Sequence, residues 1–235
     1  MAERYEDLRK LYVKKYSDNR SFADIGGLWG TVSEMLSVAH EGNAKSLTMI
    51  DVTTADTELW HKFEKRMEEK NIHKYMEVIM DISDIENLDQ NIRYEVTHCA
   101  GILYHNPNVY RVLEGLCKIT SEYLILTTMI IPEVVENEKG KVTVNPSSLV
   151  LVPSLTSIEK KIIAFELEGM FANFKADGLT NEVQYNIYDF GPWWWLPTEK
   201  CLITMCETLG MKFVEGGNSI CNMIYTGVFR NKNAK

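Results

Sequence analysis

The sequence predicts an α/β fold built on an open, mostly parallel β-sheet with helices on both faces. Three observations predict it. Short apolar runs typical of strands alternate with amphipathic runs typical of helices over residues 20–132. A glycine-rich turn follows the first apolar run, and an aspartate closes each of the next two. Because the carboxyl ends of parallel strands meet at one edge of a sheet, we expect a ligand crevice there.

The composition fits one compact domain over residues 1–235, because 45% of the residues are hydrophobic and no low-complexity tract interrupts the chain. No apolar run reaches the roughly 18 residues of a membrane span, and the first residues are charged, so we expect no span and a cytoplasmic location. The formal charge of -8 would repel a phosphate backbone, which disfavours nucleic acid as a partner. The five cysteines lack the two-residue spacing of a zinc or redox pair and are expected to be free thiols.

Residues 1–19 form the first expected element, an N-terminal helix. Tyr5, Leu8, Tyr12 and Tyr16 are spaced three, four and four residues apart, which places them on one helical face. That face either packs on the rest of the fold or covers a ligand, and the sequence leaves both open.

The first strand, residues 21–25, runs into a turn that contains Gly26, Gly27 and Gly30. Glycine permits positive φ and lets backbone N–H groups approach a ligand closely. A helix is expected directly behind the turn, with Met35 and Ala39 on its buried face. The turn has no Lys-Ser/Thr pair of a P-loop, and Leu28 occupies the place of the second glycine in a dinucleotide fingerprint.

The second and third strands, residues 46–51 and 75–80, each lead to an acid. Asp51 ends the second strand, where a carboxylate can accept hydrogen bonds from both hydroxyls of a ribose. The alternative is a surface acid beside the next helix. Asp81 follows the third strand in the same way.

The fourth strand, residues 94–100, continues into Gly101-Ile102-Leu103-Tyr104-His105. A helix over residues 109–116 follows. The fifth strand, residues 123–130, is apolar almost throughout, as expected for a parallel strand covered on both faces.

The segment from residue 133 to 190 is too long for an ordinary connection and is expected to be an insertion after the fifth strand. Within it, residues 142–144 and 149–152 are expected to pair as strands, and a helix is expected from Ser154. The broad apolar surface of that helix fits a core, a substrate pocket or a dimer interface. A homodimer therefore remains open.

Residues 191–235 are expected to supply a C-terminal helix and the last strands. They begin near three consecutive tryptophans. In an extended segment Trp193 and Trp195 would share one side, where they could bind a sugar ring or planar acceptor. Packing explains them equally well.

Together, Asp24-x-Gly26-x-x-x-Gly30, the acids Asp51 and Asp81, and the segment from Gly101 to His105 resemble the class I S-adenosylmethionine-dependent methyltransferases. The match is closest to a subgroup with Gly-Val/Ile-Leu-Tyr-His after the fourth strand. That subgroup includes tRNA wobble-uridine carboxymethyltransferases and uncharacterised enzymes thought to act on sugars, lipids or natural products. The resemblance covers residues 20–132 and resumes over 194–213. It implies a Rossmann-like methyltransferase fold with a seven-stranded sheet.

The resemblance also implies S-adenosylmethionine as cofactor, S-adenosylhomocysteine as product, and residues 20–132 as the cofactor-binding half. Asp24 and the backbone of the glycine turn would hold the methionine end, and Asp51 the ribose. The adenine would lie against Asp81 and Ile82, and the backbone from Cys99 to Gly101 would line the other side of the methionine. Leu28 departs from the family's usual glycine, so Trp29 could close over the ligand.

The function expected from these residues is methyl transfer to a small polar or amphipathic acceptor, at oxygen. His105 is the candidate general base and Tyr104 a candidate for orienting substrate, although a loop-capping histidine and a packed tyrosine remain alternatives. The other histidines, His98 included, receive no role, and no metal is expected. The rival functions are modification of a tRNA base and a non-catalytic module that binds the cofactor. Dinucleotide-dependent oxidoreduction lacks its glycine spacing.

Overall fold

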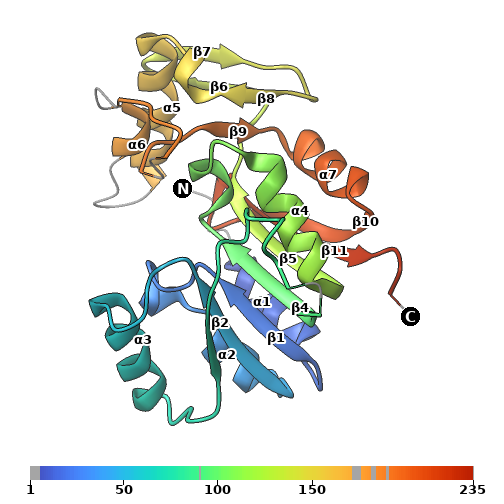
Figure 1. Ribbon diagram of the computed structural model, residues 1–235. Helices are drawn as coiled ribbons and strands as arrows, with labels where there is room; N and C mark the ends of the chain where they lie inside the picture. Colours follow the sequence, from blue (N-terminus) through green and yellow to red (C-terminus); the bar gives the residue numbers. More distant parts are fainter. Residues whose placement is uncertain (1–5, 90, 171–175, 181–183, 189–190, 235) are drawn as a thin grey trace.

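The computed structural model describes residues 6–89, 91–170, 176–180, 184–188 and 191–234. Its centre is a seven-stranded sheet in the order β10-β11-β5-β4-β1-β2-β3 (Figure 1). Strands β1 to β5 are parallel to one another, whereas β11 runs antiparallel to both of its neighbours, β5 and β10. The strands are β1 (Ser21–Ile25), β2 (Ser46–Asp51), β3 (Met76–Ile79), β4 (Tyr94–Ala100), β5 (Thr120–Met129), β10 (Met211–Ser219) and β11 (Cys221–Asn231). The mostly parallel sheet agrees with the prediction.

The bounds of β1, β2 and β4 coincide with the predicted ones. Each is a buried run that a glycine or an aspartate brings to an end, so sequence and structure mark the same residue. Strand β5 begins at Thr120, earlier than predicted, because its first residues are polar and carry no apolar signal.

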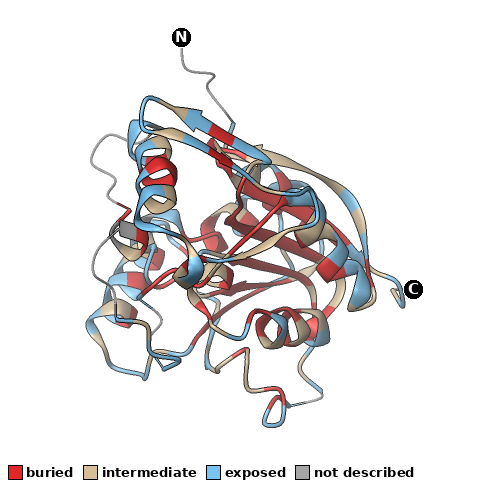
Figure 2. Ribbon diagram, turned by 90° about the horizontal axis from the view of Figure 1, so that it is seen from above, coloured by how far each residue is buried: buried red, intermediate tan, exposed pale blue. Residues whose placement is uncertain are grey.

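One face of the sheet is covered by α1 (Leu8–Tyr16), α2 (Leu36–Glu41) and α3 (Glu58–Glu69). Tyr12 and Tyr16 are buried there. Of the two alternatives for the tyrosine face of the N-terminal helix, packing on the rest of the fold is therefore the one observed for these residues. Tyr5 lies outside the described residues. The other face is covered by α4 (Val109–Ile119) and α7 (Glu199–Thr208). Figure 2 shows the buried residues concentrated in the central strands, with exposed residues around them.

The helix expected directly behind the glycine turn begins later than predicted. A short 3-10 helix, η1 (Thr31–Ser33), follows Gly30, and α2 starts only at Leu36. The reason is a long-range contact, because the carboxylate of Asp24 accepts a hydrogen bond from the main-chain nitrogen of Met35 at 2.8 Å. Asp24 thereby fixes where the chain can enter the helix.

The insertion follows β5, as predicted, and Figure 1 shows it at the end of the molecule away from α3. It contains β6 (Val134–Asn137), β7 (Gly140–Thr143), β8 (Leu149–Leu151), η3 (Val152–Ser154), α5 (Ser157–Met170) and α6 (Asp177–Thr180). The predicted pairing of residues 142–144 with 149–152 is wrong. Strand β7 forms a hairpin with β6, and β8 pairs instead with β9 (Trp195–Pro197), antiparallel. The reason is the two-residue turn at Glu138 and Lys139, which brings β6 directly beside β7 so that these two neighbouring strands pair.

Helix α5 uses its apolar surface mainly for internal packing. Ile162, Ile163 and Leu167 are buried in a cluster that includes Trp193 and Leu196. Ile158 stays 69% exposed. Phe171 and Phe174, which continue the apolar pattern expected for this helix, lie outside the described residues. Over the described ranges, no helix is long and apolar enough to cross a membrane.

Candidate active site

A cavity of about 1040 Å³ opens where the five parallel strands end. Its lining contains most of the residues that the sequence singled out: Asp24, Gly26, Gly27, Trp29, Gly30, Asp51, Asp81, Ile82, Gly101, Tyr104 and His105. The strand ends bring them together, because residues far apart in sequence meet at the carboxyl edge of a parallel sheet. The crevice predicted from the sequence is therefore present.

The glycine turn is tight for identifiable reasons. Gly26 has a φ of +77°, and a Cβ there would lie 2.4 Å from the side chain of Ile102. At Gly27 a Cβ would lie 2.8 Å from Oδ2 of Asp24. Gly30 is less constrained, since the nearest atom to an added Cβ is 3.9 Å away. Trp29 is 80% exposed at the rim of the cavity.

Asp24 and His98 form a buried pair on neighbouring strands. Their backbones are register partners in β1 and β4, and Nδ1 of His98 lies 2.7 Å from Oδ1 of Asp24. Both side chains are only 2% exposed. The second nitrogen of the imidazole, Nε2, is buried and has no hydrogen-bond partner. His98 lines the same cavity, although the sequence analysis gave it no role.

Asp51 presents an unused acceptor at the end of β2. Its Oδ1 accepts a hydrogen bond from the main-chain nitrogen of Thr53 at 2.9 Å, whereas Oδ2 is buried without a partner. A buried carboxylate oxygen without a hydrogen bond is costly. The site therefore suits a ligand with hydroxyl donors, such as a ribose.

The third acid, Asp81, is held by its own loop. Its Oδ1 accepts hydrogen bonds from the main-chain nitrogen of Ser83 at 2.8 Å and from the Ser83 hydroxyl at 2.7 Å. Both bonds use one oxygen, which leaves Oδ2 for a donor in the cavity. The next residue, Ile82, is buried against α4. This arrangement can hold a flat ring that carries an amino group.

The loop after β4 contributes Gly101 and a 3-10 helix, η2 (Leu103–His105). Gly101 has a φ of +78°, and an added Cβ would meet nothing within 4 Å, so its backbone borders open space. Burial raises the pKa of Tyr104 to about 12. Tyr104 therefore remains a hydroxyl donor at neutral pH and does not act as a base.

His105 is oriented by a main-chain carbonyl. Its Nδ1 lies 3.2 Å from the carbonyl oxygen of Pro192. A carbonyl only accepts, so Nδ1 carries the proton and Nε2 is left as the basic nitrogen. Burial lowers the pKa of His105, and the nearby carbonyls of Pro192 and Gly191 partly offset that effect. The ring is therefore neutral at pH 7, as a general base must be.

Trp193 and Trp195, unlike Trp29, do not line the cavity, which favours the packing alternative for both. Trp193 is buried and packs edge-on against Tyr104, with ring centroids 5.1 Å apart, so it supports that residue from behind. Trp195 donates its indole N–H to the carbonyl of Pro107 at 3.0 Å and packs near α4. Assigning Trp195 to the substrate is thus not supported, because this hydrogen bond and its packing hold the indole outside the lining.

Cys99 contributes no side chain to the cavity. Its thiol is fully buried, and burial raises its pKa, so it stays protonated. The neighbouring Ala100 and Gly101 line the cavity instead.

Sequence reasoning gave no site role to several other lining residues, among them Arg9, His98 and Tyr188. Arg9, on α1, has its Nε and Nη2 bound to the carboxylate of Asp7 at 2.8 and 2.9 Å. Tyr188 belongs to the insertion and is 82% exposed. The only sequence signal for Arg9 was the alternative that the N-terminal helix covers a ligand.

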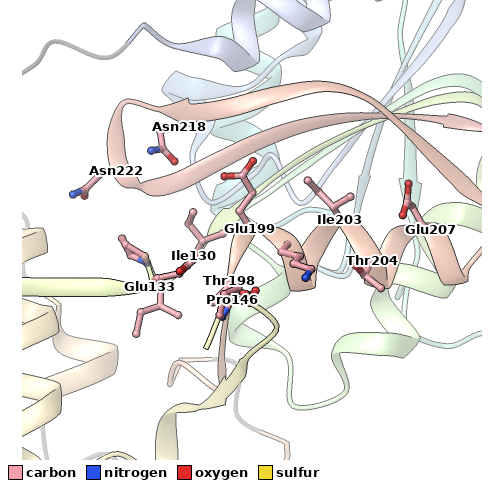
Figure 3. Close-up of a pocket in the computed structure, with 13 residues that line it drawn as sticks. Ile130, Glu133, Pro146, Thr198, Glu199, Ile203, Thr204, Glu207, Asn218 and Asn222 are labelled. Carbon is pink, nitrogen blue, oxygen red and sulfur yellow. Dashed lines mark hydrogen bonds between the residues drawn. The ribbon is translucent and has the colours of Figure 1, made fainter. Parts of the chain in front are cut away.

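A second, smaller hollow of about 540 Å³ lies between the start of α7 and the hairpin of β10 and β11 (Figure 3). None of the residues proposed from the sequence line it. Glu199 and Glu207 come from the helix, and Asn218 and Asn222 from the hairpin. Within the part of the chain that the structure describes, no three His, Cys, Asp or Glu side chains are placed to hold a metal ion.

Comparisons with known proteins find similarity in structure and not in sequence. No protein-family model and no curated protein sequence matches the chain. An S-adenosylmethionine-dependent methyltransferase from Mesorhizobium loti superposes with a TM-score of 0.61 at 10% identity, over 95% of this chain and 96% of the other.

Two solved structures with bound ligand are also similar. The 1,6-didemethyltoxoflavin-N1-methyltransferase of Burkholderia thailandensis, with S-adenosylhomocysteine, gives a TM-score of 0.55 at 11% identity, over 96% and 79% of the two chains. The magnesium protoporphyrin IX methyltransferase of Synechocystis, also with S-adenosylhomocysteine, gives 0.52 at 11% identity, over 95% and 78%. The chain therefore has the Rossmann-like methyltransferase fold that the sequence predicts.

Proposed function

We propose that this protein is an S-adenosylmethionine-dependent methyltransferase that acts on a small polar or amphipathic acceptor, at oxygen. The observation that carries the proposal is Asp51, whose buried Oδ2 has no partner at the end of β2, in a cavity shared with the glycine turn. A ribose would supply the missing donor. Solved structures of this fold with bound S-adenosylhomocysteine support the same cofactor here.

The cavity has room for a cofactor and an acceptor. Its volume of about 1040 Å³ is at the upper end of the range of roughly 300–1,000 Å³ for small-molecule sites. Asp51, the glycine turn and the Asp81 loop would occupy the cofactor half. Tyr104, His105 and the insertion residue Tyr188 would border the acceptor. Apolar side chains among the lining, such as Met129 and Ile224, favour an amphipathic molecule.

The bound cofactor would supply an electrophilic methyl group on a sulfonium. The protein's residues would then align the acceptor and exclude water. His105 would take the proton from the acceptor hydroxyl at Nε2, since Nδ1 is engaged with Pro192. Tyr104, protonated at neutral pH, would donate a hydrogen bond that orients the acceptor. Trp193 would keep the Tyr104 ring in place.

Calorimetry with S-adenosylmethionine and S-adenosylhomocysteine tests the cofactor. Asp51→Ala should weaken binding by about 1.5–3 kcal/mol, the range for a hydrogen bond to a charged group. Asp84→Ala is the matched control, because Asp84 is a nearby carboxylate that does not line the cavity. Equal affinity of wild type and Asp51→Ala would overturn the ribose assignment.

Turnover separates the enzyme from a non-catalytic module that binds the same cofactor. Wild-type protein should form S-adenosylhomocysteine when it is incubated with S-adenosylmethionine and fractions of hydroxylated small molecules. Tight binding without product from any fraction would favour the non-catalytic module. Product that appears only with tRNA would favour base modification, which the charge of -8 disfavours.

A further inference from the structure

Among the described residues that line the cavity, three buried side-chain atoms have no hydrogen-bond partner: Nε2 of His98, Oδ2 of Asp51 and Oγ1 of Thr128. His98 lies near the end of β4 between Asp24 on β1 and Ile125 on β5. Parallel register places its imidazole on the same face as the Asp24 carboxylate, 2.7 Å away. Nε2 is buried and has no hydrogen-bond partner in the structure, so a polar group of a ligand could supply one.

Asp24 itself is already engaged. Its Oδ1 is bound by His98 and its Oδ2 by the main-chain nitrogen of Met35. Gly27 also packs so closely on Oδ2 that an added Cβ would lie 2.8 Å away. A ligand that contacted this carboxylate would have to displace part of that packing. Nε2 of His98, by contrast, has no hydrogen-bond partner that a ligand would have to displace.

The chemistry of Nε2 follows from the partner of Nδ1. A carboxylate accepts, so the proton of the neutral ring lies on Nδ1 and Nε2 offers a lone pair. With Nδ1–H donating to the buried carboxylate of Asp24, a cationic N–H donor at Nε2 would complement the pair. Arg9 is the arginine or lysine side chain among the lining residues, but two of its nitrogens are already bound to the carboxylate of Asp7.

We propose that Nε2 of His98 accepts a hydrogen bond from the ammonium group of the cofactor's methionyl moiety, and that Asp24 is a positioning residue that acts through the imidazole. The inference rests on the proposed cofactor. It replaces the direct contact between Asp24 and the ammonium that the family resemblance implied. It also assigns a binding role to a histidine for which sequence reasoning found none.

The test compares ligands that differ in the groups of the amino-acid tail. Calorimetry would use S-adenosylhomocysteine, its decarboxylated analogue, its deaminated analogue, and 5′-methylthioadenosine, which lacks the whole tail. The variant is His98→Asn, because the asparagine amide can still donate to Asp24 but has no atom in the position of Nε2. This choice keeps the contact with Asp24 and removes the proposed ligand contact.

His98→Asn should weaken the binding of S-adenosylhomocysteine and of its decarboxylated analogue by about 10- to 100-fold, as for the loss of a hydrogen bond to a charged group. Binding of 5′-methylthioadenosine should be unchanged, which also shows that the variant is folded. Equal weakening of all four ligands would overturn the inference. So would a selective loss for the deaminated analogue, because Nε2 would then donate to the carboxylate.

The wild-type protein supplies a second measurement that does not depend on the variant. It should bind the decarboxylated analogue more tightly than the deaminated one, and the reverse order would overturn the inference. If wild type binds none of the adenosyl ligands, the proposed function itself fails. If it binds S-adenosylhomocysteine and His98→Asn binds it equally well, only the role of His98 fails.

Discussion

The main-chain oxygen of Ile82 packs directly onto Gly115 of α4, where an added Cβ would lie only 1.8 Å from it. A main-chain atom cannot rotate away as a side chain can. Helix α4 therefore holds the segment that follows Asp81 against the cavity. A single glycine on a helix behind the site controls the position of two residues proposed to hold the adenine.

Gly115→Ala should lower the free energy of unfolding by about 1–3 kcal/mol, because overpacking here must shift backbone. The substitution should also weaken the binding of S-adenosylhomocysteine. Gly169→Ala on α5 is the control, since a Cβ there meets nothing within 4 Å. That change should be neutral or stabilise by up to about 1 kcal/mol, because alanine is the better helix former. Urea denaturation measures both, and equal effects of the two substitutions would contradict the role of Gly115.

Local sequence signals predicted much of the fold. Strands β1, β2 and β4 end at Ile25, Asp51 and Ala100 as expected, because burial and turn residues mark those ends within a few positions. The pairing of β8 with β9 was missed. These strands are separated by the whole of α5 and α6, and no local pattern at Leu149 indicates a partner at Pro197.

In the candidate site, too, residues marked by a local signal were predicted, and residues defined by a distant contact were missed. Asp51 and Gly26 were found because their position at a strand end is itself a signal. His98 was missed because a single histidine inside an apolar strand resembles a packed residue until its partner, 74 positions earlier, is known. The orientation of Trp195 depended on its hydrogen bond to Pro107, which no spacing reveals.

Asp24→Asn should destabilise the protein even though it preserves shape. Met35 N–H and His98 Nδ1–H bind different oxygens of Asp24, and asparagine replaces one of these oxygens with an NH2 group, which cannot accept. One buried donor is left unsatisfied, which costs about 1–3 kcal/mol. Asp81→Asn should cost less, because the bonds that Asp81 accepts use a single oxygen. If urea denaturation finds the two variants equally stable, the Asp24 carboxylate is not needed for this double contact.

His105 should titrate below its ordinary pKa of about 6.5, because burial disfavours the charged ring. With a lowered folded pKa, its contribution to stability is present above about pH 6.5 and is lost as the pH falls through the folded value. Methyl transfer should decline over the same window, since the neutral ring is the base. NMR of the ring carbons measures the midpoint directly, with His105→Gln to assign the signal. A midpoint at or above 6.5 would remove the basis for both effects.

Trp29 and Trp195 should separate ligand binding from packing. Trp29 is 80% exposed and lines the cavity, so Trp29→Ala should change the free energy of unfolding by no more than about 0.5 kcal/mol. It should, however, abolish most of the change in tryptophan fluorescence on binding S-adenosylhomocysteine. Trp195→Phe removes the hydrogen bond to Pro107 and should cost about 1 kcal/mol. Because the Trp195 indole lies outside the lining, its variant should keep the fluorescence change, and a loss of the signal there would place Trp195 back at the ligand.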